Sequence, residues 1–161
     1  MFTLGEIIDL AIQIEINGEK SYRKAWNETS DTSVKSMLKW LADDETEHQK
    51  WFISMKKSID EKVEDPLLEE MGKEILNSVL GEQAFSMDDA DFSKIGDIKT
   101  LIELSVEFEK DTILFYEMLK DFIDDSSVMT GIDNIIKEEK SHVRRLEEFI
   151  GKEGILSMGK P

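Results

Sequence analysis

Two short stretches decide the fold of this chain: Asp44-Glu45-Thr46-Glu47-His48 and Glu138-Glu139-Lys140-Ser141-His142. Each places a glutamate three residues before a histidine, and these are the two histidines of the sequence. On an α-helix, side chains three residues apart lie on the same face. Each stretch therefore predicts a helix that presents one carboxylate and one imidazole in the same direction.

The composition predicts a single helical domain. The chain has 161 residues, with only two prolines and nine glycines, and long stretches are rich in Glu, Lys, Leu and Ile. This is the usage expected of a helical protein of one-domain size. We expect the domain to cover residues 1–150, followed by a C-terminal tail at 151–161.

The charge and the missing cysteines exclude several classes of function. A formal net charge of −16 repels phosphate backbones, so nucleic acid is not an expected partner. No apolar run approaches the roughly 18 residues of a membrane span, and no basic face predicts a membrane partner. The absence of cysteine excludes disulfides, thiolate metal ligands and thiol catalysis. A cytoplasmic location is expected, since the first residues also lack the basic start of a signal peptide.

Four long helices are predicted from capping residues and apolar periodicity. They cover residues 4–26, 32–58, about 98–122 and about 127–150, the last ending before Gly151. The expected caps are Thr3 with Glu6 for the first helix, Asp31 for the second, and Ser126 or Ser127 for the fourth.

A long crossover at residues 59–96 separates the second and third predicted helices. Its about 38 residues are too many for a bare loop, and Asp65-Pro66 predicts the start of a short helix at 66–79. Two short connections and one long crossover predict an all-α four-helix bundle. Other all-helical arrangements fit the same pattern.

The inward face of each predicted helix is apolar at both ends and polar in the middle. Positions repeating in steps of three and four define this face. The central glutamates are Glu15, Glu45, Glu109 and Glu139, and His48 and His142 follow in the second and fourth helices.

Four carboxylates that face one another in a core need positive charge. Each would otherwise cost several kcal/mol or take up a proton. No Lys or Arg occupies the four inward rows. Two divalent cations balance four carboxylates, and imidazole adds neutral nitrogen donors. We predict that these six residues bind two metal ions, iron first, with manganese or zinc possible. The alternative is a set of ordinary polar core residues.

An internal repeat supports the metal prediction. Four pairs of residues share an offset of 94 positions: Glu15 and Glu109, Tyr22 and Tyr116, Glu45 and Glu139, His48 and His142. The first two helices therefore look like a copy of the last two. Each tyrosine lies two helical turns beyond a glutamate, and either fills the core or donates a hydrogen bond to a metal-bound carboxylate.

The remaining aromatic and acidic residues have simpler expected roles. Trp26, Trp40 and Trp51 are predicted to lie in the core or in an interface. The acidic pairs are predicted to be solvated or to cap helices: Asp43-Asp44, Asp88-Asp89 and Asp124-Asp125.

The order of these ligands resembles the ferritin-like dimetal-carboxylate proteins, and within them the rubrerythrin-like proteins. The segments that carry the resemblance are residues 11–22, 44–48, 109–116 and 138–142, within an overall match of about 4–150. The resemblance implies an all-α, ferritin-like four-helix bundle. It further implies that Glu45 and Glu139 bridge the metals, with Glu15 and His48 on one metal and Glu109 and His142 on the other.

The resemblance also implies a function: reduction of hydrogen peroxide, or of dioxygen, by a diferrous centre, with a homodimer as the expected assembly. A full rubrerythrin carries a rubredoxin domain with four cysteines, which this chain lacks. Electrons would come from a separate donor such as a rubredoxin. Thr112 stands where rubrerythrins carry a further glutamate, and Gly18 is its counterpart. Because both residues are small, we predict room for peroxide or dioxygen at these two positions.

Two other functions fit the same residues. The first is iron binding and oxidation for storage, as in ferritins. The second is a structural bundle that the metal ions merely stabilise. Two observations distinguish these three functions: whether the metal-loaded protein is oxidised, and how large its assembly is.

Overall fold

The computed structural model describes the backbone of residues 4–58 and 98–158, and the side chains of residues 4–58 and 99–151. These residues form α1 (Leu4–Glu28), α2 (Thr32–Ser58), α4 (Ile98–Leu119), the 3-10 turn η1 (Lys120–Phe122) and α5 (Ser126–Met158). The fold is the predicted all-α four-helix bundle. The predicted crossover with its short helix, and the Thr3 cap, lie outside the described residues.

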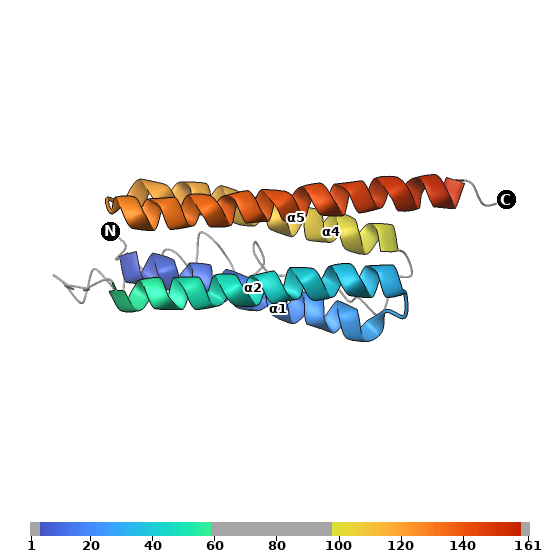
Figure 1. Ribbon diagram of the computed structural model, residues 1–161, viewed down its shortest axis with the longest axis horizontal. Coiled ribbons are helices and arrows are strands. Elements are labelled where there is room, and N and C mark those ends of the chain that lie inside the picture. Colours follow the sequence, from blue (N-terminus) through green and yellow to red (C-terminus); the bar gives the residue numbers. More distant parts are fainter. Residues whose placement is uncertain (1–3, 59–97, 159–161) are drawn as a thin grey trace.

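The bundle consists of two antiparallel helix hairpins that lie side by side along their length (Figure 1). The first hairpin is α1 packed along α2, and the second is α4 packed along α5. This pairing follows from the short connections, which hold consecutive helices next to each other. None of the helices in the described part is both long and apolar enough to cross a membrane.

Aspartates cap the two helices that begin after short connections. Asp31 Oδ1 accepts a hydrogen bond from the Val34 amide at 3.0 Å, as predicted. At the start of α5, Asp125 Oδ1 accepts from the amides of Ser127 at 2.8 Å and Val128 at 3.1 Å. The prediction of a serine cap was therefore wrong, because a carboxylate one position earlier reaches the same free amides.

The C-terminal end of α5 was also predicted wrongly. The helix runs on to Met158 through Gly151, and its last turns extend beyond the other helices (Figure 1). A glycine within a helix costs only about 1 kcal/mol relative to alanine. That cost does not end a helix whose next residues, Lys152 and Glu153, favour helical structure.

The core follows the predicted inward rows. Apolar side chains such as Ile8, Leu38, Ile102 and Leu146 are fully or almost fully buried at the ends of the bundle. Trp40 and Trp51 pack partly buried against this core, whereas Trp26 is 38% exposed and is not a core residue. Six glutamate and histidine side chains occupy the middle, between the apolar ends.

Candidate metal centre

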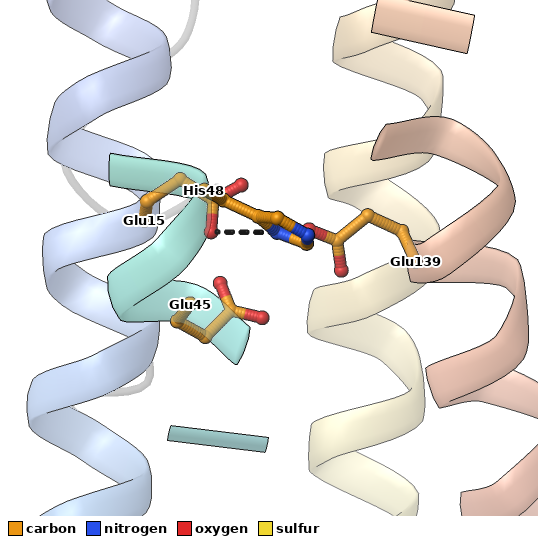
Figure 2. A group of neighbouring side chains, drawn as sticks. All are labelled: Glu15, Glu45, His48 and Glu139. Carbon is orange, nitrogen blue, oxygen red and sulfur yellow. Dashed lines mark ion pairs between the residues drawn. The ribbon is translucent and has the colours of Figure 1, made fainter. Parts of the chain in front are cut away.

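All six predicted ligands are buried at the middle of the bundle. Glu15 comes from α1, Glu45 and His48 from α2, Glu109 from α4, and Glu139 and His142 from α5. Their exposed fractions lie between 0% and 3%. Figure 2 shows His48 reaching from the first hairpin toward the Glu139 carboxylate of the second, with Glu15 and Glu45 beside it.

The six residues form two overlapping groups of four. One group is Glu15, Glu45, His48 and Glu139, and the other is Glu45, Glu109, Glu139 and His142. In each group, one donor atom per residue lies within 4.8 Å of the others, close enough to surround one ion. Glu45 and Glu139 belong to both groups, as expected of carboxylates that lie between two metal ions.

Buried donor atoms without hydrogen-bond partners test whether metal ions fit here. Eight such atoms belong to the cluster: one oxygen each of Glu15 and Glu109, both oxygens of Glu45 and Glu139, and Nδ1 of each histidine. His48 Nδ1 lies 2.9 Å from Glu139 Oε1, but the alignment is not that of a hydrogen bond. Buried polar atoms rarely lack partners in native proteins. Carboxylate oxygens and imidazole nitrogens facing one another are a donor set for two divalent ions.

The outer nitrogen of each histidine contacts an acid from the opposite hairpin. His48 Nε2 lies 2.5 Å from Glu138 Oε2, and His142 Nε2 lies 2.9 Å from Asp44 Oδ2. Such contacts hold the ring so that Nδ1 points into the cluster. Asp44, predicted to be solvated or to cap a helix, is 34% exposed, and its contact with His142 was not predicted. The missed signal is the acid directly before Glu45 and Glu139 in both repeats.

The two tyrosines also bond across the bundle. The Tyr22 hydroxyl donates to Glu109 Oε1 at 2.6 Å, and the Tyr116 hydroxyl donates to Glu15 Oε1. Burial and the adjacent carboxylates raise the pKa of both phenols well above 10, so they remain donors. The predicted hydrogen bonds to the carboxylates of the cluster are therefore present.

Two glutamates of the cluster favour the neutral acid when no metal is present. Burial, followed by the charges of Glu139 and Glu15, raises the pKa of Glu45 well above its ordinary value. Burial and the charge of Glu139 raise the pKa of Glu109 to about 8. Burial alone would raise the pKa of Glu15 too, but its contacts with Glu45 and His48 lower it.

The histidines favour the charged form under the same conditions. Burial alone would lower the pKa of His48, but the carboxylates of Glu139 and Glu15 outweigh burial and raise it to about 12. The carboxylates of Glu109 and Glu139 likewise raise the pKa of His142. Raised pKa values on two glutamates and on both histidines place protons within the cluster. Protons thus supply the positive charge that metal ions would otherwise bring.

At Gly18 a carboxylate of the cluster occupies part of the space predicted for a small oxidant, and at Thr112 that space stays a prediction. A Cβ on Gly18 would lie 2.9 Å from Glu45 Oε2 and 3.1 Å from the Phe108 ring. The carboxylate of Glu45 itself fills the place that the glycine leaves. Thr112 is buried, and its hydroxyl donates to the Phe108 carbonyl of its own helix at 2.8 Å.

A polar network on the α1–α2 hairpin supports the cluster from outside and was not predicted. Gln49 Nε2 donates to the Glu15 carbonyl at 3.3 Å and to Glu19 Oε1 at 3.0 Å. Thr46 donates to the other Glu19 oxygen at 2.5 Å, and Arg23 contacts it at 2.8 Å. These bonds hold α1 and α2 in register beside the cluster.

A four-helix bundle with this cluster defines a ferritin-like protein of the carboxylate–histidine type. The sequence model for rubrerythrin matches residues 6–150, and the chain belongs to the rubrerythrin family. No curated protein matches it significantly in sequence. The chain is similar to the 2.30 Å crystal structure of a Thermotoga maritima protein, provisionally described as a ferritin-like diiron-carboxylate protein. The two are 26% identical with a TM-score of 0.69, over 94% of this chain and 96% of that one.

Proposed function

We propose that this protein reduces hydrogen peroxide, or dioxygen, at a carboxylate-bridged di-iron centre with electrons from a separate donor protein. The observation that carries the proposal is the set of eight unpartnered, inward-facing donor atoms on six buried residues. A cluster that only filled the core would have its polar atoms paired. Membership of the rubrerythrin family supports iron as the metal.

Each residue of the cluster has a distinct place in this proposal. Glu45 and Glu139 would bridge the two ions, since both belong to each group of donors. Glu15 with His48 would complete one site, and Glu109 with His142 the other. Bound as ferrous ions, the pair supplies two electrons, and H₂O₂ with two electrons and two protons gives two molecules of water.

The two tyrosines hold carboxylates of the cluster in place. The Tyr22 and Tyr116 hydroxyls each bond one carboxylate oxygen and leave the other oxygen free for an ion. The raised pKa of both phenols keeps these protons in place.

Electrons would arrive from a protein such as a rubredoxin, because the chain has no cysteine to hold an iron–sulfur site. The homodimer remains a prediction.

Iron oxidation for storage is the second candidate, and Thr112 favours it over peroxidase chemistry. Thr112 stands where rubrerythrin-like proteins carry an extra glutamate, and its hydroxyl is bonded to the Phe108 carbonyl. No carboxylate is added to the cluster from this position. A storage protein would also release ferric iron from the site into a mineral.

Anaerobic metal analysis followed by peroxide titration tests the proposal. Protein loaded with Fe²⁺ should hold two irons per chain and consume one peroxide per pair of irons, after which reduced rubredoxin should restore the ferrous state. Glu45→Ala should abolish iron binding and peroxide consumption. Glu47 is exposed and pairs with Lys50 at 2.9 Å, so Glu47→Gln should leave iron binding and peroxide consumption unchanged. Loaded protein that peroxide and dioxygen fail to oxidise would refute redox function. Growth of light scattering after oxidation would indicate storage.

A further inference from the structure

The two histidines are held by acids that differ in their exposure to solvent. Asp44, which contacts His142 Nε2, has a side chain that is 34% exposed. Glu138, which contacts His48 Nε2, has a side chain that is 57% exposed. His142 itself is fully buried, and His48 is 3% exposed. The repeat is therefore symmetric in its ligands and asymmetric in the acids behind them.

From this asymmetry we infer that the metal site with His142 binds its ion more tightly than the site with His48, and that Asp44 is the positioning residue responsible. The inference rests on the proposed two-metal function. It adds an order of filling: the first ion enters the group with Glu109 and His142, and the second enters the group with Glu15 and His48.

Lower exposure to water makes the Asp44 contact the stronger of the two. A charge-assisted hydrogen bond weakens when water competes for the same carboxylate. Aspartate also loses less side-chain entropy than the longer glutamate when it is held in one position. A histidine ring fixed by its outer nitrogen presents Nδ1 to the ion with less reorganisation.

An aromatic neighbour further restrains the His142 ring. The rings of Trp40 and His142 are 4.9 Å apart and nearly perpendicular, at 77°. The Arg145 guanidinium lies over the Trp40 ring, 5.6 Å from its centroid. Trp40 packs against the imidazole ring, and Asp44 contacts its Nε2. Position 134, the counterpart of Trp40 in the repeat, is Asn134.

The distances alone point the other way, since the Glu138 contact is 2.5 Å and the Asp44 contact is 2.9 Å. The exposed position of Glu138 outweighs its shorter distance. More than half of its side chain lies in water, where an ion pair contributes little and a long side chain moves freely. The better shielded contact persists for a larger fraction of time.

Anaerobic titration of metal-free protein with Co²⁺, followed by its absorption spectrum against a competing chelator, tests this order. Wild-type protein should bind two ions in steps at least tenfold apart. Asp44→Asn should weaken the tight step about 10- to 100-fold, the usual effect of removing such a partner of a metal-bound histidine. Glu138→Gln should affect only the weak step. His142→Ala and His48→Ala assign the steps by removing one ligand each.

Matched variants separate positioning from simple charge loss. Asp43→Asn removes the same charge from the neighbouring residue, whose carboxylate pairs with Lys39 at 2.6 Å. This variant should leave both metal-binding steps unchanged. Asp44→Glu keeps a carboxylate at this position and should retain most of the affinity of the tight step. Two equal steps in wild-type protein, or a tight step weakened by Glu138→Gln, would overturn the inference while leaving two-metal binding intact. A protein that binds neither ion would overturn the proposed function itself.

Discussion

The α1–α2 and α4–α5 hairpins agree at the cluster and differ just outside it. Both contribute two glutamates, one histidine and one tyrosine, spaced identically. Outside the cluster, Glu19, Thr46 and Gln49 form a hydrogen-bonded network on the first hairpin. The corresponding positions of the second hairpin hold Ile113, Lys140 and Val143.

This contrast shows which positions the charge of the cluster constrains. The inward residues must jointly balance four buried carboxylates, so a change on one hairpin affects both. The outward residues solve a local problem, the packing of one helix against its partner. On the first hairpin hydrogen bonds do this, and on the second Ile113 and Val143 pack against the core. Either solution leaves the cluster in place.

The largest effect should come from removing a shared carboxylate. Glu139→Ala takes a donor from both groups and should reduce metal content from about two ions per chain to nearly none. Glu15→Ala leaves the group with Glu109 and His142 complete and should retain about one ion. Metal analysis after gel filtration measures both. Equal losses in the two variants would show that the groups are not separate sites.

Proton release should follow metal loading because the two hairpins share their charge balance. The pKa values of Glu45, Glu109, His48 and His142 are raised in the metal-free cluster, so metal ions should displace protons from these groups as they bind. Affinity should therefore rise with pH. Above about pH 8, Glu109 has already lost its proton and the number released should fall. Calorimetry in buffers of different ionisation enthalpy counts the protons, and a pH-independent affinity would contradict this balance.

Removing either tyrosine hydroxyl should cost the same. Tyr22→Phe and Tyr116→Phe each leave one buried carboxylate oxygen without its donor, which costs about 1–3 kcal/mol. Urea unfolding of the metal-free variants measures the loss of stability. If only one variant is destabilised, the two hydrogen bonds are not equivalent and the symmetry of the repeat ends at the ligands.

The smallest effect is expected at Gly151, and Gly18 provides the contrast. Gly18→Ala brings a Cβ to 2.9 Å from Glu45 Oε2 and should destabilise the protein by about 1–3 kcal/mol. Gly151→Ala meets nothing within 4 Å and should stabilise α5 by about 0.5–1 kcal/mol. Thermal unfolding compares the two. A stabilising Gly18→Ala would mean that the Glu45 carboxylate moves aside easily.

The fold and the buried glutamate–histidine cluster could be predicted from the sequence, whereas the helix ends and caps were predicted less accurately. Helical periodicity repeats over many residues, so single errors do not change its phase. A helix end depends on one or two residues with small energies. Asp125 caps α5 in place of Ser126 because its carboxylate accepts from the Ser127 and Val128 amides. Gly151 failed to end α5 because the cost of a helical glycine is small.

By itself, the sequence determined four amphipathic helices, a buried glutamate on each, and two histidines on the same faces, because these follow from spacing along a single helix. Only the tertiary structure decided which hydroxyl bonds which carboxylate and which acid holds which histidine. Those partners are 87 to 101 residues apart and come from opposite hairpins. Helical periodicity sets the direction of a side chain, but the packing of the two hairpins sets what it meets.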